Sequence, residues 1–316
     1  MSIVSEDPDP TILVIGATAV DAKGQPLESL VPGTSAPGTV RLTFGGVARN
    51  MAENLARLGL HTILLSAIGN DPMGQLLLQA TADSGVDTEQ VITSPEHRTG
   101  TYLAVLDRNG VPAHAIDDMA VMEMLTPEWI YRRRRLFREA SMVVLDANVP
   151  PRTMETIFGL AKKYDCPVCV DPTSVSLAPR LIPHLSDIFL LVPNLQEARA
   201  LVSPDAPMDT RMDAQEMAME LVNRDVEIAI ITLAEMGLYY ACSDERGHLP
   251  ALERDVVDLT GAGVALAAAV IFGLLNDIPI SEAVRLGISA AALTIQCPES
   301  VYPDLSLDHL YDELVI

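Results

Sequence analysis

The most informative segment of this chain is Asp258-Leu-Thr-Gly-Ala-Gly-Val264, which the apolar stretch Ala265–Leu275 follows without a break. The pattern predicts a glycine-rich turn that leads into an apolar helix. Such a turn directs several backbone N–H groups, and the positive end of the helix dipole, at one point. The segment therefore predicts an anion site suited to a phosphate.

Short apolar runs alternate with helical stretches along most of the rest of the chain. Continuous apolar runs of this length are typical of strands buried on both faces of a parallel sheet. We expect helices between them, the clearest at Ala48–Leu58, which Gly59 ends, and at Asp71–Ser84. The rhythm predicts an α/β fold of three layers, with a central, mostly parallel sheet covered by helices on both faces. The predicted strands are Thr11–Gly16, Ile63–Ile68, Val143–Leu145, Val168–Val170, Phe189–Val192 and Ile228–Thr232.

Two strand-rich pieces, at about residues 20–45 and 97–117, interrupt this rhythm. In the second piece, Thr101–Leu106 and Pro112–Ile116 flank a strong hairpin turn signal, Arg108-Asn-Gly110. No linker divides the chain, so we interpret both pieces as one small β-sheet lid inserted into a single domain over residues 1–316. One apolar face of so small a sheet has no core to cover it. We therefore predict that the lid meets the same surface of a second chain in a symmetric dimer.

Charge and hydropathy exclude several classes of partner. The 316 residues carry a net charge of −22, which argues against binding to nucleic acid and to anionic membranes. A phosphate site in such a chain must be built from local dipoles and a metal. No apolar segment is long enough to span a bilayer, and the acidic stretch Met1–Pro10 lacks the regions of a signal peptide, so a cytosolic location is expected.

Three motifs have simple structural interpretations. Cys166-Pro-Val-Cys169 has the spacing of a redox or metal pair, but it lies in an apolar run, and buried thiols are expected. The basic run Tyr131–Arg135 is interpreted as a solvated helix face, with Leu136 and Phe137 turned inward. The methionines of Met208–Met219 are expected to pack in the core.

A second glycine motif, Gly45-Gly-Val-Ala-Arg-Asn50, opens the first predicted helix. Together with Asp258–Val264, in this order and at this spacing, it resembles the two signatures of the ribokinase-like (PfkB) carbohydrate kinases. The resemblance covers nearly the whole chain, from about Ile12 to Leu310. Within the family the chain is most similar to the pseudouridine kinases, on the strength of Gly45–Asn50, Ile116-Asp-Asp-Met119 and Tyr302-Pro-Asp-Leu-Ser306.

The resemblance implies a ribokinase-like fold and an ATP-dependent kinase that phosphorylates the 5′-hydroxyl of a nucleoside, with pseudouridine as the expected substrate. It implies ATP and Mg²⁺ as cofactors, with K⁺ as a further candidate. A kinase for another nucleoside or for a sugar is an alternative. A protein that binds nucleoside and nucleotide without turnover is another.

The resemblance also implies a set of substrate contacts. Asp21 resembles the acid that accepts hydrogen bonds from sugar hydroxyls, a task that suits a carboxylate because it can accept from two vicinal hydroxyls; the alternative is an aspartate that caps a turn or a helix. Gly45 and Gly46 would let the backbone approach the sugar, or would simply form a tight turn. Arg49 would reach the base or the phosphate, or would point to solvent. The remaining implied contacts are Asn50, Asp118 and Asn148.

On the nucleotide side, the amides of Gly261, Ala262 and Gly263 would stabilise the developing charge. Asn194-Leu-Gln-Glu197 matches the family motif that organises hydrated Mg²⁺, and the same pattern is close to a helix capping box. Asp258 and the Thr260 carbonyl resemble ligands of a monovalent cation. The segment Ile231–Gly237 resembles the family's ATP contact, where the family usually has glycine in place of Ala234. Within the implied nucleotide site, Asn194, Thr232, Gly237, Gly261 and Gly263 are the expected contacts.

The chain departs from the family at Val264, where the family has the aspartate that takes the proton of the attacked hydroxyl. Valine has no lone pair, and general-base catalysis is typically worth ~10²–10⁴-fold, so impaired turnover is expected. Asp258 is a poor substitute because the turn or a cation is expected to engage it. Three explanations stay open: an inactive variant of an active kinase, a binding protein without turnover, or slow transfer that relies on substrate and metal alone.

Overall fold

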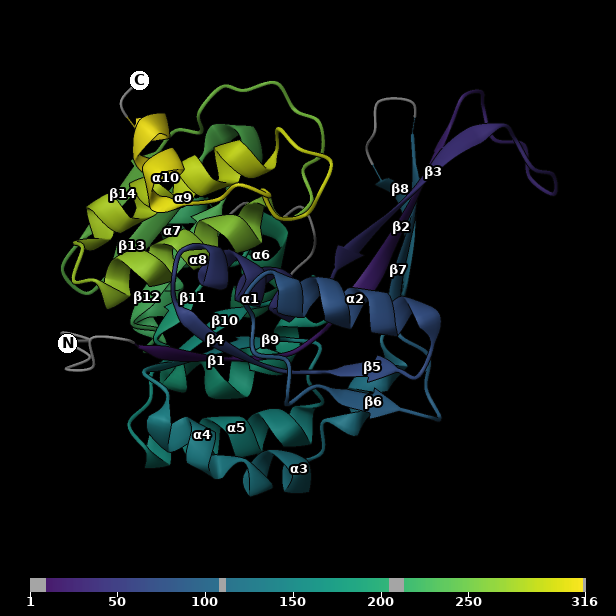
Figure 1. The fold of residues 1–316 in the computed structure, drawn as a ribbon. Coiled ribbons are helices and arrows are strands. Elements are labelled where there is room, and N and C mark those ends of the chain that lie inside the picture. Colours follow the sequence, from purple (N-terminus) through teal and green to yellow (C-terminus); the bar gives the residue numbers. More distant parts are fainter. Residues whose placement is uncertain (1–9, 108–111, 205–212, 315–316) are drawn as a thin grey trace.

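The structure is a computed structural model that describes residues 10–107, 112–204 and 213–314. Its largest element is an eight-stranded sheet with the strand order β14-β13-β12-β11-β10-β9-β1-β4 (Figure 1). Neighbouring strands from β12 to β4 are parallel, and β13 and β14 join the other edge in antiparallel pairings. The strands are β1 Thr11–Ile15, β4 His61–Leu65, β9 Met142–Asp146, β10 Val168–Asp171, β11 Leu190–Leu191, β12 Ile228–Thr232, β13 Leu238–Cys242 and β14 Arg246–Leu249.

Helices cover both faces of this sheet, which confirms the predicted three-layer α/β fold. One face packs against α1 (Val47–Arg57), α8 (Ala262–Leu275), α9 (Ile280–Thr294) and α10 (Leu307–Leu314). The other face packs against α3 (Pro127–Arg132), α4 (Arg134–Glu139), α5 (Pro151–Lys163), α6 (Leu195–Val202) and α7 (Ala214–Asn223), together with the 3-10 segments η1 (Ala120–Met124) and η2 (Ala178–Asp187). A third 3-10 segment, η3, spans Ala234–Met236.

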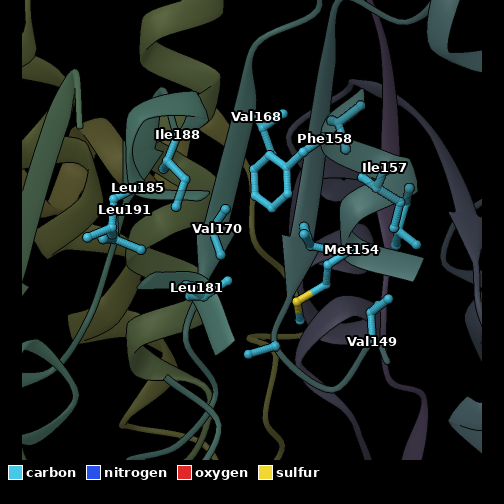
Figure 2. Packing of buried hydrophobic residues seen from close by; sticks show 14 of the residues in the cluster. Val149, Met154, Ile157, Phe158, Val168, Val170, Leu181, Leu185, Ile188 and Leu191 are labelled. Atoms are coloured by element: carbon cyan, nitrogen blue, oxygen red, sulfur yellow. The ribbon is translucent and has the colours of Figure 1, made fainter. Parts of the chain in front are cut away.

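Alternate residues of each central strand supply the two halves of the core. In β1, Leu13 and Ile15 belong to one apolar cluster, and Ile12 and Val14 belong to the other. Side chains from α5 and from β10 pack together in the first cluster (Figure 2). Because both faces of these strands are buried, their sequences read as continuous apolar runs.

The two strand-rich pieces form a separate four-stranded sheet with the order β3-β2-β7-β8, which confirms the predicted small sheet. It projects from one end of the main sheet (Figure 1). Strand β2 pairs antiparallel with β3 and parallel with β7, and β7 and β8 pair antiparallel as the hairpin signal predicted. The turn residues Arg108–Gly110 lie outside the described residues. The strands are β2 Ala19–Pro26, β3 Gly38–Gly45, β7 Gly100–Leu106 and β8 Pro112–Asp118.

The predicted single strand Ile63–Ile68 was wrong, because the chain breaks at Ser66 into β4 and β5 (Ala67–Gly69). The buried Ser66 hydroxyl donates to the Gly16 carbonyl and accepts from the Thr18 hydroxyl. These bonds belong to the connection between β1 and β2, so β5 leaves the main sheet. It pairs instead with β6 (Ile92–Ser94), and the helix α2 (Pro72–Asp83) follows it with Asp71 as its N-cap.

Most of the simple interpretations of the remaining motifs hold where the structure describes them. Cys166 and Cys169 are free, buried thiols. The Arg135 side chain is exposed and pairs with Glu139, whereas Phe137 is fully buried. Met217 is fully buried, as predicted. Met219 is only half-buried, and its sulfur accepts from Arg246 at 3.0 Å, so the core prediction was wrong for that residue. Met208 and Met212 lie outside the described residues. Within residues 10–107, 112–204 and 213–314, no helix has both the length and the apolar character to cross a membrane.

Candidate functional site

The residues that the sequence singled out gather at the edge of the main sheet where its parallel strands end. Strands β9 and β10 end there at Asp146 and Asp171, and β12 ends at Thr232. The carboxyl edge of a parallel sheet is where α/β proteins bind their ligands. The lid begins at the same edge, because β2 follows β1 after only a short connection.

The predicted glycine-rich turn is present at the start of α8, and we call Gly261–Gly263 the anion turn after the role predicted for it. Gly261 has a φ of 88°, and a Cβ placed on it would lie 1.9 Å from the Ser300 carbonyl oxygen, so only glycine fits. Gly263 faces open space, with nothing within 4 Å of where its Cβ would be. The turn is therefore fixed on its protein side and open where an anion would approach. Val264 is 8% exposed and packs in the core.

A lysine from the lid reaches this turn. Lys23 on β2 is buried, and its Nζ donates to Asp258 Oδ2 at 2.7 Å and to the Thr260 hydroxyl. The Thr260 amide in turn donates to Asp258 Oδ1 at 2.9 Å. The two residues predicted as ligands of a monovalent cation thus contact an ammonium group that belongs to the chain itself. Lys23 was not among the predicted site residues, although its spacing from Asp21 puts both side chains on one face of a strand.

Asp21 lies on the same face of the lid as Lys23. It is 5% exposed, and burial raises the pKa of its carboxyl to about 6, although the charges of Lys23 and Arg49 oppose this. Gly45 lies directly against it, since a Cβ on that residue would come within 2.3 Å of Asp21 Oδ2. Gly45 is therefore required by the carboxylate, which goes beyond the tight turn that was its alternative interpretation.

The lid register shows which side chains surround Asp21. Thr43, Asp21, Tyr102 and Asp117 form one cross-strand row. The buried Thr43 hydroxyl oxygen has no hydrogen-bond partner. Burial and the charge of Asp21 raise the pKa of the Tyr102 hydroxyl. This polar row faces the anion turn, because Lys23 on the same face reaches Asp258.

The same register corrects the prediction for Asp118. Asp118 pairs with Thr101, and Thr101 pairs with Val20, so this row lies on the opposite face of the lid. Its carboxylate accepts a hydrogen bond from the Ala120 amide. Asp117, one residue earlier, shares the face of Asp21. The sequence could not separate the two neighbours, because a shift of one residue exchanges the faces of a strand.

Asn50 and Arg49 both lie in the first turns of α1, and both are buried. Gly46, with a φ of 92°, is the N-cap of this helix, and a Cβ on it would lie 2.5 Å from the Ala17 carbonyl oxygen. Asn50 is buried near the start of the helix, and its Oδ1 accepts from Arg49 at 3.0 Å. Arg49 is buried too, forms an ion pair with Glu53 and donates to the Phe44 carbonyl, so the alternative that it points to solvent was wrong.

Asp146, which was not among the predicted site residues, organises the loops around the site. It is buried at the end of β9, and its Oδ2 accepts from the amides of Ala17, at 2.7 Å, and Ala48, at 3.0 Å. Its Oδ1 accepts from the amide of Asn148 at 2.9 Å. One carboxylate therefore joins the end of β1, the start of α1 and the predicted sugar contact Asn148.

Three of the predicted nucleotide contacts, Asn194, Thr232 and Gly237, lie near the ends of β11 and β12. Asn194 and Thr232 form a parallel β-bridge. Gly237 has a φ of 88°, and a Cβ on it would lie 2.0 Å from the Leu249 carbonyl oxygen. Ala234, where the family resemblance predicts glycine, has a φ of 51°. The position thus keeps the left-handed backbone that glycine favours, although its side chain is a methyl group.

Asn194 and Glu197 form the capping box of α6, with the backbone N–H of Asn194 donating to Glu197 Oε2 at 2.9 Å. Burial raises the pKa of the Glu197 carboxyl, and burial together with the charge of Glu197 raises that of Asp171 to about 8. A cation bound nearby would favour the ionised form of both carboxyls. Among the described residues no group of three or more His, Cys, Asp or Glu side chains could hold a metal directly. These residues fit a Mg²⁺ ion that keeps its waters.

Comparison with known proteins gives consistent results along the whole chain. Residues 9–306 match the pfkB family of carbohydrate kinases. The pseudouridine kinase of Escherichia coli is 32% identical over 297 residues, which cover 94% of each chain. A putative sugar kinase from Clostridium perfringens superposes with a TM-score of 0.81 at 31% identity, over 98% of this chain and 96% of that one. The Arabidopsis thaliana ribokinase solved with ribose and ATP shares the fold, with a TM-score of 0.85 at 21% identity, over 98% and 99% of the two chains.

Proposed function

Because the chain belongs to the pfkB family of carbohydrate kinases, we propose that it binds ATP and a nucleoside and transfers the γ-phosphoryl group to the 5′-hydroxyl of that nucleoside. Pseudouridine is the substrate we propose first, on the motifs of the sequence and the similarity to the Escherichia coli pseudouridine kinase. A kinase for another nucleoside or for a sugar is the second candidate. We propose the cytosol as its location, since no helix among the described residues could cross a membrane.

The observation that carries this proposal is the placement of Asp21 opposite the anion turn. Lys23 contacts Asp258 and Thr260 at the turn, and Asp21 lies two residues earlier on the same face of β2. Two residues of strand span about 7 Å. A sugar ring whose hydroxyls donate to Asp21 would therefore present its remaining hydroxyl toward Gly261–Gly263, where the phosphate would bind.

The reaction asks little covalent chemistry of the protein. The hydroxyl oxygen forms a bond to the γ-phosphorus while the bond to the β-phosphate oxygen breaks, and ADP leaves. The amides at the start of α8 would stabilise the charge that develops on the transferred group. Mg²⁺, when bound, would neutralise charge on the phosphates, and Asn194, Glu197 and Asp171 would hold its waters.

The proton of the attacked hydroxyl has no acceptor at position 264. Val264 is packed into the core, and both oxygens of the Asp258 carboxylate already accept hydrogen bonds. We therefore propose that turnover by this chain is slow. A protein that binds both ligands without turnover is the alternative function that this observation favours.

Restoring the acid tests the proposal. We would measure ADP release with pseudouridine, uridine, guanosine and ribose, for the wild type, Val264→Asp and Val264→Asn. Val264→Asp should raise the turnover rate by about two orders of magnitude or more. Val264→Asn, an amide of the same size, should stay slow because it cannot take the proton.

Two results would contradict the proposal that Val264 makes turnover slow. Ordinary kinase turnover by the wild type, unchanged in Val264→Asp, would show that another group serves as the base. A variant that binds ATP and pseudouridine but stays inactive with aspartate restored would favour the binding protein. Calorimetry with Asp21→Ala and Asn50→Ala tests whether these residues contact the nucleoside. Both substitutions should weaken nucleoside binding and leave ATP binding nearly unchanged.

We also propose that the lid joins two copies of the chain. The face of the lid sheet opposite Asp21 carries Val40, Leu42, Leu103 and Ile116. The exposed fraction is 76% for Val40, 58% for Leu42 and 69% for Ile116. Leu42, Leu103 and Ile116 lie in one cross-strand row through Ala22. A contiguous apolar face on a projecting single sheet suits a symmetric contact with the same face of a second copy.

A further inference from the structure

Lys23 is the cation nearest to the anion turn in the described part of the chain. Its side chain is 8% exposed, and it approaches from the lid, 235 residues away in sequence from the carboxylate that it contacts. It bonds to both Asp258 and Thr260, the two positions that resemble ligands of a monovalent cation. The charge that such an ion would bring is thus already present as an ammonium group.

The arrangement leaves little room for a second cation on Asp258. One carboxylate oxygen accepts from Lys23 and the other from the Thr260 amide. Arg41, also from the lid, places a guanidinium nitrogen 3.9 Å from the same carboxylate. A K⁺ ion here would have to displace the buried lysine or bind beside it, and two like charges on one carboxylate repel each other.

We propose that the Lys23 ammonium takes the place of the monovalent cation, so that nucleotide binding by this chain does not depend on K⁺. The proposal rests on the proposed function, because it assumes that a nucleotide phosphate binds at Gly261–Gly263. The lysine supplies positive charge beside these amides in a chain whose net charge is −22. Since Lys23 belongs to the lid, this charge reaches the turn only when the lid is in the position seen here.

One observation favours a cation bound near the anion turn. Ser300, whose carbonyl lies against Gly261, has a buried hydroxyl oxygen without a hydrogen-bond partner. A single hydroxyl does not make a cation site, and a bound ion would need further ligands. The experiment therefore includes Ser300→Ala, which would remove this ligand and leave Lys23 in place.

The direct test is calorimetry of ADP binding in buffers where tetramethylammonium replaces K⁺ at constant ionic strength. The wild type should show the same Kd in both salts within about two-fold. Lys23→Met, which is one atom shorter than lysine and removes its charge, should bind ADP about ten-fold more weakly or worse without K⁺ and recover when K⁺ is added. Arg41→Ala is the matched control, a lid cation near the same carboxylate, and should be as insensitive to K⁺ as the wild type.

Thermal melting without nucleotide gives a second readout. K⁺ should raise the melting temperature of Lys23→Met above its value in tetramethylammonium, because a ligand that binds only the folded state stabilises it. It should not do so for the wild type. If ADP binds to no form in any salt, the proposed function fails, and the melting curves still decide whether Lys23 replaces the cation.

Three results would overturn the inference. The first is a wild type whose ADP affinity or melting temperature rises specifically with K⁺, and loss of that rise in Ser300→Ala would locate the ion. The second is Lys23→Met with no response to K⁺ in either measurement. The third is an Arg41→Ala variant that becomes K⁺-dependent while Lys23→Met does not. Should Lys23→Met fold in neither salt, the comparison of salts on the wild type still decides.

Discussion

Replacing Asp21 by asparagine should make the protein more stable while it destroys nucleoside binding. The carboxyl is 5% exposed, and its burial raises the pKa from the ordinary 3.8 to about 6. A rise of this size makes the ionised carboxylate about 3 kcal/mol less favourable in the folded chain than in the unfolded chain. Asparagine has the same shape and carries no charge, so Asp21→Asn should recover a large part of that cost at pH 7.

The pH dependence separates this effect from a change in packing. The folded state holds the Asp21 proton more tightly than the unfolded state, so the contribution is favourable at low pH and is lost as the pH rises through about 6. The advantage of Asp21→Asn over the wild type should therefore grow by about 1.3 kcal/mol between pH 5 and pH 7. Urea denaturation of both proteins at several pH values in this range measures it.

The same titration should appear in binding. In the proposed complex, sugar hydroxyls would donate to the charged carboxylate of Asp21, so the nucleoside affinity of the wild type should rise with pH through about 6 and should level off above it. A stability difference between the two proteins that is independent of pH would refute the reasoning. So would an Asp21→Asn variant that keeps nucleoside affinity.

Three further predictions follow from the backbone and the lid. Gly261→Ala should abolish ADP binding and lower the melting temperature, because its Cβ would lie 1.9 Å from the Ser300 carbonyl oxygen, whereas Gly263→Ala, with nothing within 4 Å, should melt like the wild type; equal melting of the two would contradict the turn geometry. Ala234→Gly should raise the free energy of unfolding by about 0.5–1 kcal/mol, since it relieves a φ of 51° at the cost of backbone entropy, and a loss of stability in urea denaturation would count against it. Leu42→Glu should shift the chain from dimer to monomer in light scattering, and a wild type that is already monomeric at micromolar concentration would end the proposal of a lid dimer.

Much of the main sheet could be predicted because its strands are buried on both faces. Runs such as Val143–Leu145 and Ile228–Thr232 stand out as apolar, and each lies within an observed strand. The edge strand β14 could not be found in this way, because Arg246–Leu249 is short and polar and gains its structure from pairing with β13. The break at Ser66 was hidden for a similar reason, since its hydroxyl bonds to atoms 50 and 48 residues away.

The candidate site likewise contains residues that a local motif marks and residues that only contacts distant in sequence bring together. The glycines at 45, 46 and 261 could be predicted because a local motif marks them, and each proves to lie against a neighbour that excludes a side chain. The contact between Lys23 and Asp258 joins residues 235 apart, so nothing local announces it. The choice between Asp117 and Asp118 depends on the strand register, and the turn signal in the sequence predicts this register only approximately.

The burial of α8 affects the order in which the protein can be completed during synthesis. All but three of its residues, Ala262, Gly263 and Leu274, are buried, and α1 and α9 pack against it. Helix α1 leaves the ribosome early. The face of α1 that packs against α8 therefore stays uncovered until α8 has been synthesised. We expect nascent chains to become resistant to protease on this face only after α9 has emerged, and resistance at shorter lengths would show that another segment covers α1 in the meantime. The turn proposed to hold phosphate is therefore among the last parts of the molecule to take shape.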